Sequence, residues 1–394
     1  MTLYTAIEAK TVSHPSKTTY LGNVPGQGKE TLVDLTKGKP TGGYASFAYL
    51  LPAPTLARYK KYGIDTSKGY PEAPPQTEIP TFVDEAYAVR NKDFPYTERG
   101  KNADPEKKAL FGAATEVRHL TKHIGTEIVG LRLQALTDQQ RDELALLIAE
   151  RVVVFFRDQD LSPQKQLELG EYYGQVEKHP QAQHVPGLEG ISIIWPEYYT
   201  QIGYNSTFKQ PRSGWHTDLV HEHQPAGITH LHNDTIPQLS PALQEFLIGK
   251  KAVYVSAHKY FDRNDPLNGK RRIEREHPIV RTHPVTGWKS LYVNRAMTDR
   301  IVGLEPGESK VLLEYLFRVF EKNLGIQVRF NWEPTKKGLG TSALWDNRVS
   351  QHNAIWDYEN TEPRHGTRVT SLAELPYFDP QSKSQRESQG LSIQ

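Results

Sequence analysis

Short strand-forming runs recur along this chain with few helices between them, and this pattern constrains its fold most strongly. Residues 152–156 are a continuous run of β-branched and aromatic residues, as expected for a strand buried on both faces. Further runs of this kind lie at residues 190–194, 227–231, 252–256, 290–293, 328–332, 342–345 and 368–371. Many short strands with a few packing helices favour a jelly roll or barrel over a parallel βαβ fold.

Three helices are expected among these strands. The first begins after Thr137, which can form a capping box with Gln140. A second follows Ser162 and Pro163, and a third covers residues 307–322 with a stripe of leucine and phenylalanine side chains. Because that stripe has to pack against a sheet, the predicted architecture is mainly β with flanking helices.

The composition divides the chain into three parts. Residues 1–108 are rich in Pro, Gly, Tyr and Lys, show no sustained helical or strand period, and are predicted to form an irregular N-terminal extension. That extension either wraps around the body or covers the substrate. Residues 109–378 carry the strand pattern and are expected to form one domain. The Lys-, Ser- and Gln-rich residues 379–394 are predicted to be a flexible C-terminal tail.

Composition also excludes several kinds of chemistry. The 394 residues contain no cysteine, which removes disulfides, thiolate nucleophiles and cysteine-bound zinc or iron–sulfur sites. The 48 basic and 46 acidic residues nearly balance, so charge indicates neither a nucleic acid nor a membrane as partner. No signal-like start and no apolar run near the ~18 residues of a membrane span are seen, so a cytoplasmic protein is expected.

Fifteen histidines in a cysteine-free chain direct attention to metal sites built from imidazole and carboxylate groups. The densest stretch is WHTDLVHEHQPAGITHLHND, in which several pairs stand two residues apart and therefore lie on one face of an extended segment. These pairs are His216 with Asp218, His221 with His223, His230 with His232, and His232 with Asp234. One such pair alone is a weak signal, and most of these histidines are expected to be ordinary strand residues.

The downstream sequence selects the first pair. A Trp-Asp-Asn-Arg block at residues 345–348 is followed by His352, which with His216 and Asp218 supplies the two histidines and one carboxylate of a facial triad. Such a triad leaves three positions of an octahedral iron open. Two arginines, Arg364 and Arg368, come next, and an arginine there can hold a carboxylate bidentately.

Several long collinear segments resemble the iron(II)/2-oxoglutarate dioxygenases of the taurine dioxygenase type, including the fungal sulfonate dioxygenases. The resemblance runs from about residue 116 to 378 and includes GWHTDL, SLYVNRAMTDRIVGL, LWDNRVSQHNAIWDY and RHGTRVT. It implies a double-stranded β-helix core, a jelly roll of the cupin-like kind, with iron(II) held by His216, Asp218 and His352.

The resemblance also implies roles around the metal. Arg364 would bind the far carboxylate of 2-oxoglutarate and Arg368 the anionic head group of the substrate, although their one-turn spacing leaves this division open. His179 would also face the substrate. The implied reaction consumes oxygen and 2-oxoglutarate, hydroxylates an alkylsulfonate such as taurine, and releases sulfite, succinate and carbon dioxide.

The predicted substrate pocket departs from the family pattern. Taurine-specific relatives carry an aromatic residue and an amide where this chain has Ala182 and Arg212, and Met297 replaces a pocket phenylalanine. With Leu219 beside the ligand pair, these residues predict a smaller and more cationic pocket. Such a pocket suits an anionic substrate whose body differs from that of taurine.

A segment that carries a cosubstrate-binding threonine in the relatives is missing between Pro237 and Leu239. Asp234 and Thr235 run almost directly into the next helix, so the chain is shorter here by roughly one strand and a turn. Two interpretations stay open. Either the molecule lacks this strand and one cosubstrate contact, or the printed sequence omits residues of the natural chain.

The residues leave three other functions open. One is a hydroxylase of the same class that acts on an amino acid, a carboxylate or a sulfate ester. Another is a cupin-type metal-dependent isomerase or hydrolase, and the third is a non-catalytic binding protein, favoured if the missing segment is truly absent. The state of assembly, including a homodimer or homotetramer, is open as well.

Overall fold

The structure is a computed structural model that describes residues 47–201, 214–230, 246–353 and 364–391, together with four short strands closer to the N-terminus. These strands form two antiparallel pairs, β1 (Thr19–Gly22) with β2 (Thr31–Asp34) and β3 (Pro40–Thr41) with β4 (Tyr44–Ala45). No helix within the described ranges has the length and apolar character needed to cross a membrane.

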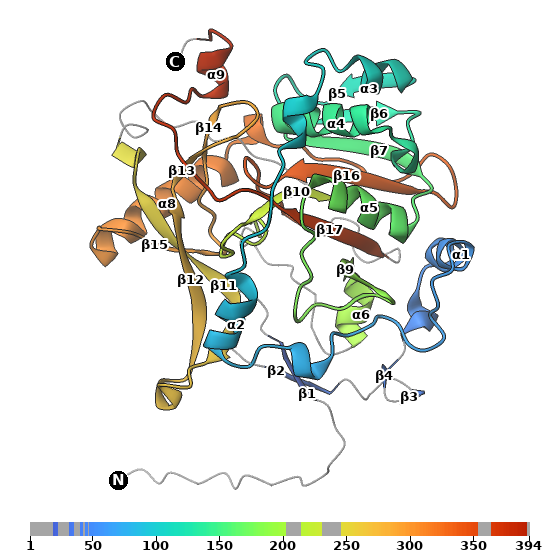
Figure 1. Ribbon diagram of the computed structural model, residues 1–394, viewed down its shortest axis with the longest axis horizontal. Coiled ribbons are helices and arrows are strands. Elements are labelled where there is room, and N and C mark those ends of the chain that lie inside the picture. The colour runs from blue at the N-terminus through green and yellow to red at the C-terminus, as the bar shows by residue number, and fades with distance from the viewer. Residues whose placement is uncertain are drawn as a thin grey trace, which may run out of the picture.

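An eight-stranded sheet runs through the middle of the molecule (Figure 1). Its strand order is β5 (Glu116–His119), β6 (Thr126–Val129), β7 (Val153–Gln159), β16 (Gly340–Asp346), β10 (Ala226–His230), β17 (Gly366–Leu372), β9 (Leu188–Ile194) and β8 (His184–Val185). Neighbouring strands are antiparallel except β6 and β7, which are parallel. Because β10 pairs with both β16 and β17, segments far apart in the sequence meet in this part of the sheet.

A second layer of structure lies beside this sheet. Its three-stranded sheet has the order β12 (Lys270–Pro278), β11 (Lys251–Phe261) and β15 (Thr298–Ile301), and β13 (Val280–Thr282) pairs with β14 (Lys289–Leu291) nearby. Helix α8 (Pro306–Glu321) buries Leu313, Leu316 and Phe320 in one apolar cluster with Tyr254 and Val293. The predicted helix over residues 307–322 is therefore confirmed, and its stripe packs against strands as expected.

The first predicted helix is also confirmed as α4 (Asp138–Arg151). The Thr137 hydroxyl accepts from the Gln140 backbone N–H at 3.3 Å, and the Gln140 side chain accepts from the Thr137 N–H at 2.9 Å, which completes the capping box. Leu144 and Ile148 pack in a core cluster that also contains residues of β7 and β16. Helices α5 (Pro163–Tyr173), which follows Ser162, and α3 (Lys108–Ala113) flank the same sheet (Figure 1).

The N-terminal extension is more regular than its composition predicts. Within it lie α1 (Ala53–Lys61) and α2 (Val83–Arg90), where an irregular segment was expected. Ala86 of α2 is buried against Tyr260 and Ile273 of the three-stranded sheet, and the Tyr87 hydroxyl accepts from the Glu274 N–H at 2.9 Å. Such short helices owe their stability to packing against distant segments, which a local sequence period does not reveal.

Two other expectations differ from the structure. Residues 328–332 are not a strand: Phe330 stacks on Phe155 with ring centroids 3.9 Å apart, and the Arg157 guanidinium donates to the carbonyl oxygens of Asn331 and Glu333 at 2.7 Å each. Near the C-terminus, where a flexible tail was expected, the short helix α9 (Gln385–Ser388) is held by an ion pair of 3.3 Å between Glu387 and Lys289. Another short helix, α6 (Pro196–Gln201), follows β9. The division into 1–108, 109–378 and 379–394 stays a prediction.

Candidate metal centre

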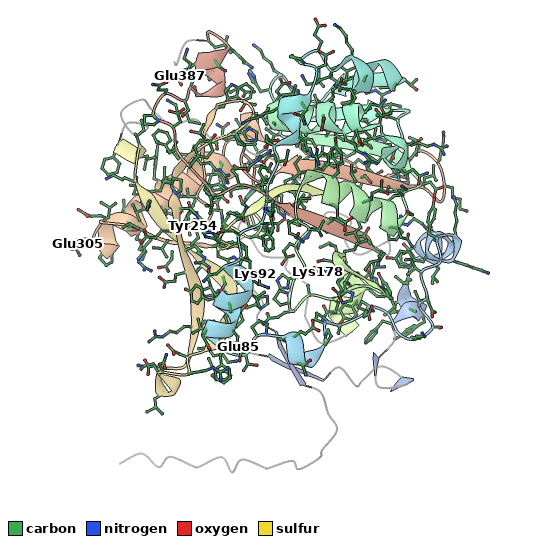
Figure 2. All side chains as sticks on the ribbon, viewed as in Figure 1. Glu85, Lys92, Lys178, Tyr254, Glu305 and Glu387 are labelled. Atoms are coloured by element: carbon green, nitrogen blue, oxygen red, sulfur yellow. The ribbon has the colours of Figure 1, made fainter. Side chains whose placement is uncertain are left out.

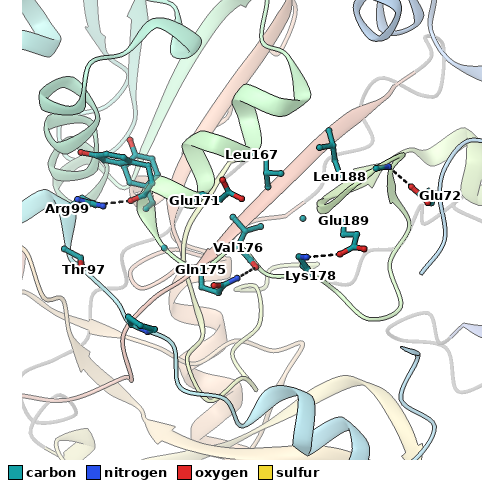
Figure 3. A pocket seen from close by; sticks show the side chains of 16 residues that line it. Glu72, Thr97, Arg99, Leu167, Glu171, Gln175, Val176, Lys178, Leu188 and Glu189 are labelled. Carbon is teal, nitrogen blue, oxygen red and sulfur yellow. Dashed lines mark hydrogen bonds and ion pairs between the residues drawn. The ribbon is translucent and has the colours of Figure 1, made fainter. Parts of the chain in front are cut away.

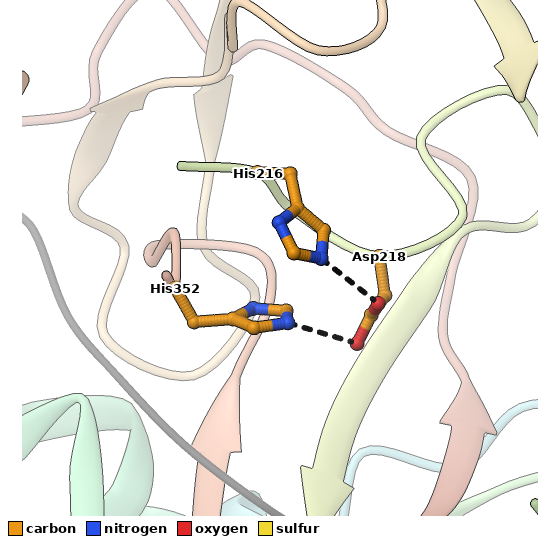
Figure 4. A group of neighbouring side chains, drawn as sticks. All are labelled: His216, Asp218 and His352. Atoms are coloured by element: carbon orange, nitrogen blue, oxygen red, sulfur yellow. Dashed lines mark ion pairs between the residues drawn. The ribbon is translucent and has the colours of Figure 1, made fainter. Parts of the chain in front are cut away.

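Two histidines and one aspartate converge where the loops after β16 and before β10 meet (Figure 4). His216 Nε2 lies 3.9 Å from Asp218 Oδ1, and His352 Nε2 lies 3.8 Å from Asp218 Oδ2. One donor atom from each of the three residues can be chosen so that all lie within 4.8 Å of one another. Among the residues that the structure describes, no other group of His, Asp and Glu meets this criterion.

The backbone holds the three side chains in register. His216 and His352 form an isolated antiparallel bridge, with N–H to O=C hydrogen bonds of 3.0 and 2.8 Å in the two directions. Asp218 begins the turn that leads to β10, and its N–H donates to the Asn347 side-chain oxygen at 3.3 Å. Two residues separated by more than 130 positions therefore present their imidazoles side by side because their backbones pair as in a sheet.

The protonation states of the three candidate ligands suit the binding of a metal cation. The Nδ1–H of His216 donates to the Gly214 carbonyl at 2.8 Å, which leaves Nε2 as the lone-pair donor. Burial lowers the pKa of His352 to about 3, so its imidazole is neutral at pH 7. Burial alone would raise the pKa of Asp218, but the Arg368 guanidinium and the two histidines outweigh it and hold that pKa below its ordinary value.

Orphaned donor atoms show that these residues fit a metal ion. Asp218 Oδ2 and His352 Nδ1 are buried without a hydrogen-bond partner among the described residues. Buried polar atoms are normally paired, so an unpaired carboxylate oxygen 3.8 Å from the Nε2 atom of His352 suits a metal ion as its partner. Two histidines and one carboxylate on one side are the donor set of a non-haem iron(II) centre, and the same set also suits manganese or zinc.

The two predicted arginines lie at different depths relative to this group. Arg368, on β17, donates from Nη1 to Asp218 Oδ1 at 3.0 Å, directly beside the candidate ligands. Arg364 comes just before β17, where its backbone N–H donates to the Glu197 carboxylate at 3.0 Å. The structure therefore brings the Arg368 side chain to the triad, while Arg364 lies two residues before the start of β17.

The structure describes three of the residues predicted to contact the substrate: His179, Leu219 and Met297. His179 is partly buried, and its ring meets that of His258 edge-on at 5.5 Å; burial and then His258 hold the pKa of His179 well below its usual range, with Arg368 among the further causes. Leu219 directly follows the candidate ligand Asp218 and adopts a left-handed conformation (φ 54°). Met297 packs at the edge of the apolar cluster that includes Trp215.

Several sequence predictions fall outside the described residues. Arg212 is one of them, and so are His232, Asp234 and the junction between Pro237 and Leu239. The Trp345 ring packs 4.9 Å from His352, as expected of a residue that supports the site.

Two functional candidates were missed by sequence reasoning. Glu177 is a partly buried carboxyl close to the triad: burial raises its pKa to about 7, against the opposing influence of Arg90 and Arg368, and Asp218 raises it further. Asn347 is fully buried and ties Asp218 to the sheet. A single glutamate among 46 acidic residues carries no local signal, whereas Asn347 stood inside the Trp-Asp-Asn-Arg block without a role.

A cavity of about 650 Å³ lies elsewhere, between α5, β9 and the segment around Arg99 (Figure 3). None of the three candidate ligands lines it. Its charged lining groups are largely satisfied: Lys178 pairs with Glu189 at 2.8 Å, and Arg99 donates to the Tyr172 carbonyl at 3.0 Å. Unlike the triad, this cavity offers no converging set of reactive or unpaired groups, so its size does not make it the functional site.

A sheet-rich fold with a His-Asp-His group, in which Asp218 and His352 are buried and His216 is partly buried, defines the chain as a candidate metalloprotein of the 2-His-1-carboxylate kind. Its residues 116–370, more than half of the chain, match the model of the taurine catabolism dioxygenase TauD, TfdA family. The chain belongs to this family of dioxygenases.

Individual relatives agree with this assignment. A Saccharomyces cerevisiae protein named alpha-ketoglutarate-dependent sulfonate dioxygenase is 35% identical over 289 residues, which cover 67% of this chain and 68% of that protein. An Acinetobacter baylyi protein named alkylsulfatase is 28% identical, with 66% of this chain and 86% of the relative covered. The crystal structure of a taurine dioxygenase from Burkholderia xenovorans superimposes with a TM-score of 0.55 at 28% identity, covering 68% of this chain and 92% of that one.

Proposed function

We propose that this protein is an iron(II)- and 2-oxoglutarate-dependent dioxygenase that hydroxylates a small alkylsulfonate. The observation that carries the proposal is the His216, Asp218 and His352 group, whose donor atoms converge with a carboxylate oxygen left unpaired. Membership of the TauD, TfdA family supports iron and 2-oxoglutarate as its partners. The sheet order, with β10 between β16 and β17, is consistent with the double-stranded β-helix core proposed for the fold.

The protein's own residues supply charge and orientation. When bound, iron(II) would provide the site at which oxygen and 2-oxoglutarate react to give a hydroxylating oxidant, succinate and carbon dioxide. Arg368 neutralises Asp218 in the absence of a metal, and its remaining donors would face an anionic head group in the pocket. Arg364 would bind the far carboxylate of the cosubstrate, since its backbone is anchored by Glu197.

The proposed substrate pocket lies on the Arg368 side of the triad. His179 and Leu219 would border it, together with Met297 and Arg212 as predicted from sequence. Because His179 is held neutral by burial, it would donate or accept a hydrogen bond rather than add charge. An anionic group, held by one permanent cation and one neutral imidazole, would place its neighbouring carbon toward the metal. Hydroxylation of that carbon in a sulfonate would release sulfite.

A sulfate ester is the second candidate substrate. The alkylsulfatase relative is the specific observation that favours it, because a sulfate ester carries the same anionic head group on an additional oxygen atom. Hydroxylation beside that oxygen would release sulfate instead of sulfite. The two candidates therefore differ in the inorganic product.

Anaerobic titration of the iron(II)-loaded protein with 2-oxoglutarate tests the proposal. A weak visible charge-transfer band is expected on addition of 2-oxoglutarate, followed by its perturbation by taurine, a longer alkylsulfonate or an alkyl sulfate. Succinate, sulfite and sulfate measured after oxygen is admitted would then identify the substrate class. His216→Ala and Asp218→Ala should abolish the band, whereas His123→Ala, on the β5–β6 hairpin, should leave it unchanged. Absence of the band in the unaltered chain would favour a non-catalytic binding protein.

A further inference from the structure

The segment that begins at the last residue of α2 lies against both pieces of chain that form the candidate metal centre. We call this segment, residues 90–98, the clasp. It precedes the range that matches the family model. Helix α2 runs from near Glu85 toward Lys92, with its C-terminal end directed to the middle of the molecule (Figure 2). The N-terminal extension therefore enters the region of the triad through this segment.

The clasp contacts the turn after Asp218 residue by residue. Arg90 Nη1 lies 3.2 Å from His221 Nε2, and the same guanidinium forms an ion pair with Glu222. Asp93 Oδ1 lies 2.8 Å from His223 Nε2.

Gln224 binds the backbone of Phe94 in both directions. The Phe94 N–H donates to Gln224 Oε1 at 2.6 Å, and Gln224 Nε2 donates to the Phe94 carbonyl at 3.0 Å. The same amide nitrogen also donates to the Ala373 carbonyl at 3.0 Å, just beyond β17. The Phe94 ring packs against the cluster that contains Leu219, the residue directly after the ligand. Every residue from 221 to 224 thus contacts the clasp.

The far end of the clasp contacts the block that precedes His352. The Arg348 guanidinium donates to the Tyr96 hydroxyl at 3.0 Å and pairs with Glu98. Arg348 also pairs with Asp346 at 2.6 Å, and the adjacent Asn347 accepts from the Asp218 N–H. One short segment of the extension therefore bridges the two loops that carry the ligands.

The ion pairs at the two ends of the clasp are buried, whereas the Asp93–His223 pair between them is exposed. The Arg90 side chain is 4% exposed and that of Glu222 8%, while Arg348 is 1% exposed. Exposed ion pairs contribute little to holding a segment in place. Buried ion pairs hold their partners firmly, because separating them would leave a buried charge without a partner or water. The clasp thus restricts the turn at Asp218, whose Leu219 already adopts a left-handed conformation.

We propose that the clasp fixes the Asp218 turn for metal binding, and that Arg90 is a positioning residue of the metal centre. This inference rests on the proposed metal site and extends it to a part of the chain outside the family match. Partners that orient metal ligands commonly change affinity by about 10–100-fold when they are removed. Loosening the clasp should therefore weaken metal binding even though no metal ligand is altered.

Co(II) alone, titrated anaerobically into the full-length chain, is the probe. Its ligand-field absorption reports both the affinity and the geometry of the site. Arg90→Ala is expected to weaken Co(II) binding about 10-fold or more and to change the band shape, with partial recovery in Arg90→Lys. Gln224→Ala removes the two hydrogen bonds to Phe94, together with the one to Ala373, without leaving a buried charge, and should weaken binding in the same direction.

Arg263→Ala is the matched control. Arg263 pairs with Asp84 at the exposed start of the same helix, so its removal loosens α2 without touching the turn. Its Co(II) affinity should stay within about twofold of the unaltered chain. If Arg90→Ala fails to fold, as judged by circular dichroism, Gln224→Ala decides by the same criterion.

Two results would overturn the role of the clasp: Co(II) affinity and band shape unchanged in the folded variants, or an equal loss in Arg263→Ala. Failure of the unaltered chain to bind Co(II) is distinguishable from both, because it removes the metal centre itself.

Discussion

Asn347 joins the two halves of the candidate metal centre through a fully used amide. Its oxygen accepts from the Trp345 indole N–H at 3.1 Å and from the Asp218 N–H at 3.3 Å. Its nitrogen donates to the Gly227 carbonyl at 2.9 Å and to the Thr229 hydroxyl at 2.7 Å. With all four positions satisfied in a fully buried side chain, Asn347 cannot be replaced without stranding a partner.

Asn347→Ala is expected to destabilise the protein by about 2–4 kcal/mol, because two buried N–H groups lose their acceptor. Metal affinity should fall as well, since the Asp218 backbone loses its anchor. Urea unfolding of the metal-free protein measures the first effect and Co(II) titration the second. Asn268→Ala, at an exposed asparagine, is the control and should cost less than about 0.5 kcal/mol. Equal stability of the two variants would refute the anchoring role.

The two arginines allow a separate prediction about binding. Arg364→Ala should raise the concentration of 2-oxoglutarate needed for half-saturation by about 10–100-fold, as expected when a charge-assisted hydrogen bond worth about 1.5–3 kcal/mol is lost. The half-saturating concentration of the sulfonate should change less than threefold. Arg368→Ala should show the reverse pattern. Anaerobic band titrations with each compound distinguish the two, and an exchanged pattern would reverse the assigned roles.

At the residue scale the sequence predicted the three candidate ligands that the structure brings together, but not the residues that support them. The i, i+2 spacing of His216 and Asp218, read with His352, predicted the three residues that the structure brings together. Arg90 and Glu177 reach the same region from more than 35 positions before the first ligand, in segments without a motif. Long-range contacts of this kind depend on the folded path of the chain, which local spacing does not encode.

Among the elements, α8 shows how far periodicity can be trusted. Its apolar stripe was predicted, and Leu316 is fully buried in the cluster with Tyr254 and Val293. Leu316→Ala should reduce the free energy of unfolding by about 2–5 kcal/mol through lost burial and a residual cavity. Val311→Ala on the exposed face of the same helix, where Val311 is 73% exposed, should change it by less than about 0.5 kcal/mol. Chemical denaturation of both variants compares them, and a similar loss in each would mean that the exposed face is also covered.

Strands were predicted well where both faces are apolar and poorly where charge alternates. β7, β10, β16 and β17 correspond to predicted runs. β12 has the sequence KRRIEREHP and was missed, because its side chains are mostly charged and only Ile273 and His277 are buried along it. β12 is a strand because it pairs with β11 over eight register positions, and this long-range pairing is not indicated by its composition.

Across the whole molecule, buried titratable groups make stability depend on pH in two opposite directions. His277 on β12 is buried, and its Nε2–H donates to the Glu222 carbonyl at 2.9 Å. Burial lowers the pKa of His277 to about 3, below the ordinary value near 6.5. Below pH 6.5 the unfolded chain therefore binds a proton that the folded chain refuses, so acidification favours unfolding. Glu177, whose pKa burial raises to about 7, has the opposite sign: its contribution is present at low pH and is lost as pH rises through 7.

These signs can be separated by comparing variants between pH 7.5 and 5.5. His277→Gln keeps an N–H donor but does not titrate, so its loss of stability on acidification should be smaller than that of the unaltered chain by about 1.4 kcal/mol. Glu177→Gln should show a larger loss than the unaltered chain, by at most about 2 kcal/mol because the side chain is partly exposed. Denaturant unfolding of the metal-free chains at both pH values measures these differences. Parallel pH dependence in all three proteins would show that neither group changes its proton affinity on folding.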